Sequence, residues 1–177
     1  MCFKTSNERK INMAEISGKN LVLRAMTQKE MRALWRKYEP AEYSGESAYV
    51  YNEEAIDARF EKNERQSDRN TVLGIFTKTD EIIGEVALSQ IVFSEKRCDI
   101  SIFLANNGYR GKGFGTEALL LAKKLAREQL GLERMYADVK PANAVIKAVL
   151  KKCGFSHTKT FYAGTPKEVA VYFALLK

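Results

Sequence analysis

Three glycines lie within five residues in the segment Arg110-Gly111-Lys112-Gly113-Phe114-Gly115-Thr116. Because glycine lacks a Cβ atom, such a segment turns tightly and brings its backbone N–H groups close to a ligand. A strand pattern precedes it and a helical pattern follows it. The start of a helix favours phosphate through its dipole and its unpaired N–H groups. These residues therefore predict a loop that binds a phosphorylated ligand.

The basic residues are concentrated around this loop. Residues 108–160 contain eleven Lys and Arg against four Asp and Glu, and this excess equals the net charge of +7 of the whole chain. A site for a polyanionic ligand requires such a concentration of positive charge. Nucleic acid is the rival ligand, but the lysines are spread over two predicted helices without interleaved aromatic residues, so we do not expect it.

The cysteine and histidine content limits the chemistry. Cys2, Cys98 and Cys153 are isolated in the sequence, and His157 is the only histidine. A structural zinc site uses about four Cys or His ligands, so we expect no metal. A Ser–His or Cys–His nucleophile is also disfavoured, and we interpret His157 as an ordinary strand residue. With neither a long apolar segment nor a secretory leader pattern, we expect a cytoplasmic protein that does not bind membranes.

The hydrophobic patterns predict one mixed α/β domain over residues 19–177, preceded by a flexible polar tail over residues 1–18. The capping box Thr27-x-x-Glu30 predicts the start of the first helix, and Gly131 predicts the end of the helix that follows the glycine loop. The other expected elements are strands at 20–25, 71–77, 82–90, 98–104, 135–139, 155–162 and 168–176 and helices at 52–66 and about 141–153.

The glycine loop matches the R/Q-x-x-G-x-G/A signature of the GNAT superfamily of N-acetyltransferases, with Arg110, Gly113 and Gly115 at the defined positions. The wider sequence, over about residues 98–160, resembles the RimJ/RimL and spermidine acetyltransferase branch. The matching motifs are Gly111-Lys112-Gly113, Thr116-Glu117-Ala118, Arg134–Val139, Pro141-x-Asn143 and Lys152-Cys153-Gly154-Phe155. The resemblance implies a GNAT-like fold, with a mixed sheet of about six to seven strands and about four helices, and acyltransferase activity.

The resemblance further implies acetyl-CoA as the acetyl donor. Its pyrophosphate would lie on the backbone N–H groups from Arg110 to Thr116, and its pantetheine would pair with the strand that ends at Phe103 and Leu104. Asn143 would contact the cofactor, and Lys112 would add positive charge. The residues alone leave an alternative open for each of these two roles. Asn143 also suits the plain start of a helix, and Lys112 also suits a solvated position in a loop.

Two positions depart from the branch pattern. Ile146 replaces a serine, and Leu150 replaces the tyrosine that is proposed in the family to protonate the departing thiolate, so another donor or water must serve. The amine must lose its proton before it attacks the thioester, which costs about 4–5 kcal/mol at neutral pH for a lysine-like amine but only about 1 kcal/mol for an α-amine. Glu85 and Asp99 are the candidate general bases, and either is equally interpreted as a charge at a strand end.

The acceptor is expected to be a polyamine, another small amine or a protein N-terminus. Residues 39–64 contain eight Asp and Glu against Arg59 and Lys62, and in the family this region covers the acceptor. Its charge would attract a cationic amine, although a solvated helix face explains it equally well. Tyr43, Tyr49 and Tyr51 would line an acceptor pocket or pack the loop. The alternative function is a non-catalytic acyl-CoA sensor, and the apolar segment Val169–Leu176 suggests a strand edge for a homodimer.

Overall fold

A computed structural model describes residues 13–41, 48–65, 69–162 and 168–176, so Cys2 and Tyr43 lie outside the described residues. Within them, eight strands form one mixed sheet in the order β1-β2-β3-β4-β5-β6-β8-β7. The elements are β1 (Ile16–Ser17), β2 (Leu21–Arg24), α1 (Gln28–Arg36), α2 (Glu53–Arg65), β3 (Thr71–Thr77), β4 (Ile82–Val92), the 3₁₀ turn η2 (Phe93–Glu95), β5 (Arg97–Leu104), α3 (Phe114–Glu128), β6 (Arg134–Val139), α4 (Ala144–Lys152), β7 (Ser156–Tyr162) and β8 (Glu168–Leu175). The expected α/β domain with four α-helices is confirmed, with one strand more than expected.

The additional strand is β1, which lies in the stretch interpreted from sequence as a tail. Ile16 pairs with Leu23 of β2 and is buried in the core. Two residues are too few to produce an alternating pattern, so sequence periodicity does not reveal such a strand. The boundary between tail and domain at residue 18 stays a prediction.

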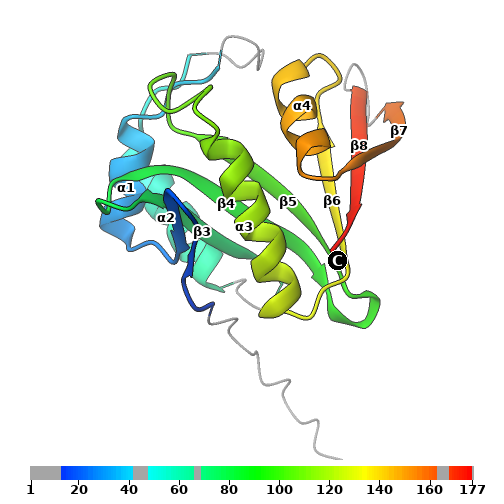
Figure 1. Cartoon of the computed structure of the whole chain (residues 1–177). Helices are drawn as coiled ribbons and strands as arrows, with labels where there is room; N and C mark the ends of the chain where they lie inside the picture. The colour runs from blue at the N-terminus through cyan, green and yellow to red at the C-terminus, as the bar shows by residue number, and fades with distance from the viewer. Residues whose placement is uncertain (1–12, 42–47, 66–68, 163–167, 177) are drawn as a thin grey trace, which may run out of the picture.

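The helices cover the two faces of the sheet unequally (Figure 1). Helix α3 lies along one face, where its buried side chains join the main core with those of β2 to β6. Leu150 of α4 belongs to the same core. Helices α1 and α2 pack on the opposite face, where Met31, Leu34 and Ile56 form a second, smaller core with Phe76. The two cores hold β4 and β5 between them.

The predicted capping box at the start of α1 is present. The Thr27 hydroxyl accepts the Glu30 N–H at 3.2 Å, and the Glu30 carboxylate accepts the Thr27 N–H at 2.7 Å. The Arg24 guanidinium lies against the same carboxylate and lowers the pKa of Glu30. Helix α3 ends at Glu128 with Gln129 as its C-cap, and the predicted stop Gly131 follows with a φ of +65°, a conformation that favours glycine.

The sheet opens between β5 and β6. These parallel strands pair only at their beginnings, where Arg97, Cys98 and Asp99 face Arg134, Met135 and Tyr136. From Ile100 to Leu104, β5 stays paired with β4, while β6 continues alongside β8. The resulting gap, called the wedge below, widens towards the ends of the two strands, where α3 begins and α4 lies (Figure 1).

Strand β8 lies inside the sheet, between β6 and β7. The expectation that Val169–Leu176 offers a free edge is therefore wrong, because both edges of β8 are already paired. Strand β7 forms the edge instead, and a homodimer stays a prediction. Among the described residues, no helix has the length and apolar character needed to cross a membrane.

Candidate functional site

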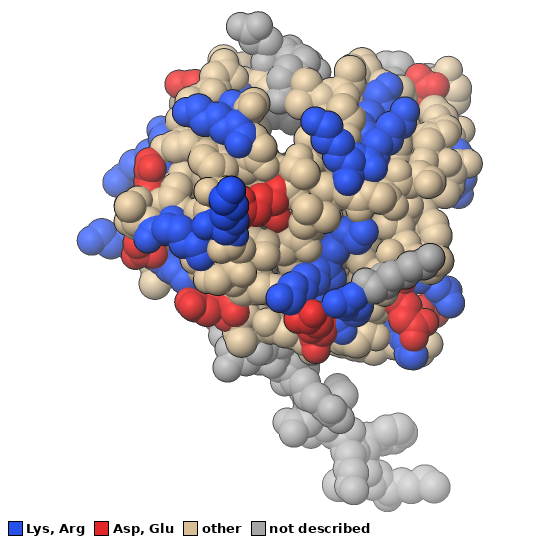
Figure 2. All heavy atoms as spheres, in the orientation of Figure 1, with Lys and Arg blue, Asp and Glu red and all other residues tan. Residues whose placement is uncertain are grey.

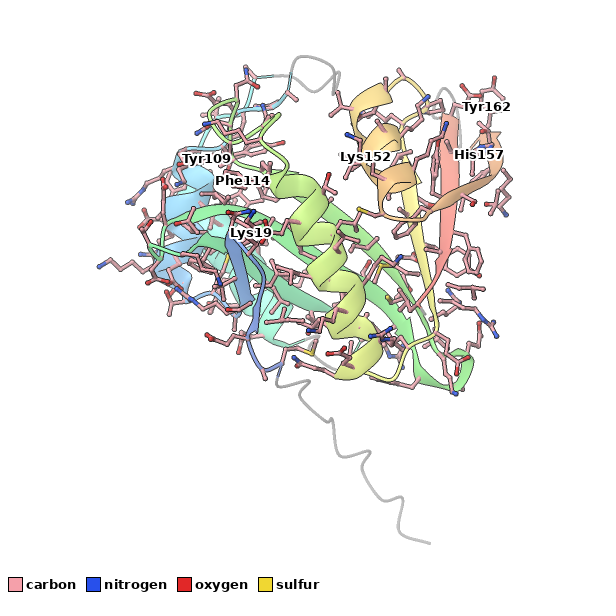
Figure 3. All side chains as sticks on the ribbon, in the orientation of Figure 1. Lys19, Tyr109, Phe114, Lys152, His157 and Tyr162 are labelled. Atoms are coloured by element: carbon pink, nitrogen blue, oxygen red, sulfur yellow. The ribbon has the colours of Figure 1, made fainter. Side chains whose placement is uncertain are left out.

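A cavity of about 330 Å³ fills the open end of the wedge. Four parts of the chain line it: the end of β5, the glycine loop, the start and inner face of α4, and the segment after α1. The lining residues are Tyr38, Ala41, Ile102, Phe103, Leu104, Arg110, Gly111, Gly113, Gly115, Thr116, Asn143, Val145, Ile146, Val149 and Lys152. Figure 3 shows Phe114 at the start of α3 and Lys152 on α4, on either side of the gap.

The glycines of the loop serve two different purposes. Gly111 and Gly113 have φ values of +74° and +83°, a backbone conformation that favours glycine, and Gly113 is the N-cap of α3. Gly115 lies in the first turn of the helix without a positive φ. A Cβ atom added at Gly115 would meet no heavy atom of the protein within 4 Å. The backbone at Gly115 is therefore open to a ligand.

The start of α3 supplies hydrogen-bond donors at this opening. The first helical bond runs from the Glu117 N–H to the Gly113 carbonyl at 3.0 Å. The N–H groups of Phe114, Gly115 and Thr116 precede that bond, at the positive end of the helix dipole. This geometry suits an anion, as the sequence predicts.

The side chain of Arg110 fixes the loop in place. Its guanidinium donates to the Leu104 carbonyl at 3.0 Å, to the Asn107 side chain at 2.8 Å and to the Glu39 carbonyl. These bonds join the loop to the end of β5 and to the segment after α1. The side chain of Arg110 therefore holds the loop, and a contact of its backbone N–H with a ligand stays a prediction.

The backbone of β5 presents polar groups to the wedge. The Leu104 carbonyl accepts a bond from the Arg110 side chain, whereas the Ala105 N–H bonds to Ile83 of β4. Since the N–H and C=O of one strand residue lie on the same edge, the Leu104 N–H also faces the wedge, and so does that of Ile102. An extended ligand would find an unpaired strand edge there.

Helix α4 forms the other wall of the cavity. The side-chain Oδ1 of Asn143 caps the helix by accepting the Ile146 N–H at 3.0 Å, and Asn143 also lines the cavity. The interpretation as a helix start is confirmed, and the contact with the cofactor stays a prediction that the position of Asn143 in the cavity lining permits. Val145 is 47% exposed, and its apolar side chain borders the cavity.

Leu150 does not reach the cavity. Its side chain is 1% exposed and packs in the main core. Sequence reasoning did not assign a site role to Tyr38, Ala41, Val149 or Lys152, all of which line the cavity. Lys152 belongs to the matched motif Lys152-Cys153-Gly154-Phe155, and this was the sequence signal that could have identified it as a site residue. Tyr38 comes from a segment far from any motif.

Positive charge surrounds the opening. Lys152 of α4 lines the cavity, and Lys151 beside it and Lys112 of the loop are exposed. Figure 2 shows basic side chains on both sides of the hollow. Part of the basic excess in residues 108–160 thus lies at the cavity, while other members such as Arg127 and Lys159 lie elsewhere.

Glu85 of β4 lies directly opposite Phe103 in the antiparallel ladder, so both side chains project towards α1 and α2. The Glu85 side chain is 3% exposed and forms an ion pair with Arg59 of α2. Burial raises the pKa of Glu85, and Arg59 opposes that rise. The indole N–H of Trp35 also opposes the rise in pKa, without reaching hydrogen-bond geometry.

Asp99 lies four residues before Phe103 on β5, opposite Ser89. Four residues of strand span about 13 Å, so Asp99 is at the other end of the strand from the cavity. Burial and the neighbouring Asp138 raise its pKa. The structure does not bring Glu85 and Asp99 together, and neither side chain lines the cavity.

Aromatic side chains separate the cavity from Glu85. The Phe103 ring contacts those of Trp35 and Tyr38, each at a centroid distance of 5.1 Å. Tyr49 packs against the same two rings at 5.4 and 5.3 Å. Tyr51 donates a hydrogen bond to Glu53 at 3.2 Å. Of the described tyrosines, Tyr38 alone lines the cavity.

The acidic region is less negative than its sequence implies. Glu53 pairs with Arg36, and Asp57 pairs with Arg32, so arginines of α1 neutralise the carboxylates of α2 that face them. The pairing lowers the pKa of both carboxylates. Because charge neutralisation by another helix is not visible in a local count, the expected attraction for polycations loses its basis at these residues.

His157 lies on β7 and bonds to Thr160 at 2.9 Å, which confirms the interpretation as a strand residue. Figure 3 shows it on the outer strand, far from Tyr109 and Phe114. In the described part of the chain, no group of three or more His, Cys, Asp or Glu side chains is placed to hold a metal ion.

Known proteins share this architecture. The RimL ribosomal L7/L12 α-N-protein acetyltransferase in complex with coenzyme A is similar over 92% of this chain and 98% of its own, with a TM-score of 0.79 and 17% identity. The spermidine N-acetyltransferase of Vibrio cholerae, solved with CoA and spermine, gives a TM-score of 0.72 over 88% and 95% at 18% identity. Mycobacterium smegmatis RimJ, in complex with CoA-disulfide, gives 0.71 over 88% and 81% at 19% identity.

A comparison with curated protein sequences finds no significant match. The family model of the acetyltransferase (GNAT) domain, in contrast, matches residues 20–156, which is most of the chain. That range includes the glycine loop, strands β5 and β6 of the wedge and all of the residues that line the cavity. The structural relatives belong to the branch that the sequence motifs indicate. The chain belongs to the GNAT family of acetyltransferases.

Proposed function

We propose that this chain transfers the acetyl group of acetyl-CoA directly to a primary amine. The wedge is the observation that carries the proposal. It places an unpaired strand edge at Ile102 and Leu104 in line with the exposed N–H groups at the start of α3. An extended chain that ends in phosphates matches both features at once.

The residues present fit acetyl-CoA. The open space at Gly115 admits phosphate oxygens against the backbone, and Lys152 and Lys112 add positive charge at the rim. Val145, Ile146 and Val149 offer an apolar wall to the pantetheine chain. Acetyl-CoA supplies a thioester carbonyl to the attacking amine, and the Leu104 N–H is the backbone donor placed to stabilise the oxygen of that carbonyl.

The amine approaches from the side of α1 and α2, where Phe103 and Tyr38 close the cavity. Glu85 is favoured over Asp99 as the proton acceptor because it lies opposite Phe103, at the cavity end of the ladder. Its raised pKa also brings the carboxylate closer to the range of an effective general base. Since Glu85 is buried under Arg59, proton transfer to it requires either a water molecule or movement of Arg59.

We assign the Tyr38 hydroxyl as the group that protonates the departing thiolate. Tyr38 lines the cavity together with Phe103 and Leu104. Leu150, in contrast, is buried in the core and has no proton to donate. The C–S bond breaks as the C–N bond forms, and the sulfur takes its proton from the Tyr38 hydroxyl, which bulk water then reprotonates. The missing tyrosine at position 150 therefore does not require a non-catalytic sensor.

The test is CoA release, followed with a thiol-reactive dye, from acetyl-CoA and a panel of amines. The panel contains spermidine, an aminoglycoside, a lysine-rich peptide and peptides with N-terminal Ser or Ala. Turnover above the protein-free rate with any member supports the proposal, and Tyr38→Phe should then lower kcat. Tight acetyl-CoA binding by calorimetry, with no turnover of any amine, would overturn the proposal in favour of the sensor.

A further inference from the structure

The ion pair between Arg59 and Glu85 sits at the acceptor side of the cavity. Glu85 is 3% exposed, whereas the Arg59 side chain remains 38% exposed. The Arg59 guanidinium also lies over the Trp35 ring, 4.9 Å from its centroid. A buried carboxylate and an indole therefore hold this guanidinium in place, while part of its surface faces solvent.

Unsatisfied polar atoms gather around the same pair. Among the described residues, four buried side-chain atoms have no hydrogen-bond partner: Trp35 Nε1, Arg59 Nε, Asn63 Nδ2 and Glu85 Oε2. Three of them are donors and one is an acceptor. Asn63 follows Arg59 by one helical turn, so the two side chains lie on the same face of α2. Buried donors without partners are costly, and a ligand oxygen would satisfy them.

The Trp35–Phe103 contact links this group to the cavity. Trp35 touches Phe103, whose ring lies at a centroid distance of 5.1 Å, and Phe103 lines the cavity. An amine bound at the end of β5 would therefore have Arg59 on the far side of the aromatic rings. A group attached to that amine would have to extend past the Phe103–Trp35 contact to meet the exposed part of the guanidinium.

The local charge disfavours polycations. The Glu85 carboxylate is compensated by Arg59, and Glu53 and Asp57 are compensated by arginines of α1. The second ammonium of a polyamine would approach a guanidinium instead of an unpaired carboxylate. A carboxylate near the reacting amine would instead meet the exposed part of the guanidinium and the donors Arg59 Nε and Asn63 Nδ2, which have no hydrogen-bond partner among the described residues.

We propose that Arg59 is a specificity-determining residue, which selects amines that carry a carboxylate close to the reacting nitrogen and disfavours polyamines. The inference rests on the proposed function and names its acceptor class. Acidic peptide N-termini and acidic free amino acids share this chemistry. Besides its proposed role as proton acceptor, Glu85 holds the guanidinium in place through its buried carboxylate.

The experiment compares kcat/KM for the amidated peptides Ala-Glu-Ala-Ala and Ala-Gln-Ala-Ala, which differ in one charge, and for glutamate and spermidine. The wild type should prefer the Glu peptide over the Gln peptide about five- to tenfold, as expected for one partly exposed ion pair. The Arg59→Gln variant should bring that ratio close to one. Comparison with glutamate separates peptide acceptors from free amino acids.

Lys62→Gln is the matched control. Lys62 is an exposed residue of α2, about one helical turn after Arg59. Its substitution therefore removes the same charge from the same helix. This variant should keep the wild-type ratio, and Arg59→Lys should keep part of it. A change of similar size in Lys62→Gln would show a general field effect and overturn the role of Arg59.

A binding readout separates this inference from the proposed function. Calorimetric titration of the CoA-bound protein with the two peptides should give the same preference without turnover. The double variant R59Q/E85Q, which replaces the ion pair by two amides, should lose it even if R59Q alone folds poorly. Equal binding of both peptides by the wild type would overturn the inference, whereas selective binding without CoA release would overturn only the acetyl transfer.

Discussion

Gly115→Ala should stabilise the protein and weaken its binding of acetyl-CoA. The Cβ atom would meet no protein atom within 4 Å, and Gly115 lies in α3 without a positive φ. Replacement of glycine by alanine inside a helix stabilises by about 0.5–1 kcal/mol, so Tm should rise by roughly 1–4 °C. The free protein therefore gains stability from the substitution.

The ligand would lose contact for the same reason. The added methyl group would occupy the space through which phosphate oxygens reach the N–H groups at 114–116. Loss of one hydrogen bond to a charged group costs about 1.5–3 kcal/mol, which is roughly a 10- to 150-fold increase in Kd. Thermal unfolding without ligand and calorimetry with acetyl-CoA measure the two effects separately.

Gly131→Ala provides the control, because its Cβ would also meet no protein atom. Gly131 has a φ of +65° and lies at the other end of α3, so alanine there should destabilise by about 1–2 kcal/mol and leave Kd unchanged. An unchanged Kd in Gly115→Ala would refute the placement of phosphates at this turn. A fall in both stability and affinity would refute the reasoning from open space.

Three further outcomes follow from the cap, from a buried carboxylate and from the thiols. Thr27→Ala removes the side-chain acceptor of the capping box and should destabilise by about 1 kcal/mol, or roughly 2–4 °C in Tm, with acetyl-CoA affinity unchanged in calorimetry. Burial raises the pKa of Asp99 above its ordinary value of 3.8, so its stabilising contribution is present below that pH and is lost as the pH rises. Asp99→Asn should therefore raise Tm at pH 7, by an amount that shrinks towards pH 4; a constant difference would contradict this. Burial also raises the pKa of Cys98 to about 12 and that of Cys153 above its ordinary value, so in a Cys2→Ser variant both thiols should react with a disulfide reagent at pH 8 only after unfolding.

Local signals account for the parts of this molecule that the sequence predicts well. The glycine loop, the Thr27 cap and the stop at Gly131 depend on single residues whose backbone or side-chain preferences are strong. The element order follows from apolar periodicity. These features are encoded within a few neighbouring positions, so the glycine loop and the helix that follows it are found where expected.

The acceptor side depends on contacts between distant segments. Arg59 and Glu85 are 26 residues apart, and neither belongs to a motif, so their pairing emerges only when α2 packs over β4. The same holds for Tyr38 and for the arginines that neutralise Glu53 and Asp57. Strand β8 likewise lies inside the sheet because β7, which precedes it in the chain, occupies the edge and leaves the place beside β6 to β8. Local patterns do not specify which strand ends at an edge.

The short ladder between β5 and β6 divides the sheet into two parts, which we expect to open locally with different ease. Three residue pairs join the β1–β5 part to the β6–β8 part, although α3 and α4 also pack together. A ligand in the wedge would contact Leu104 on one part and Asn143 on the other, and so would cross-link them. Amide hydrogen exchange in β6 and β8 should slow when the ligand binds, while exchange in β2 and β3 stays the same. Bound acetyl-CoA would then stabilise the contact between the two parts of the sheet. Local opening of the β6–β8 part would be the path by which CoA leaves.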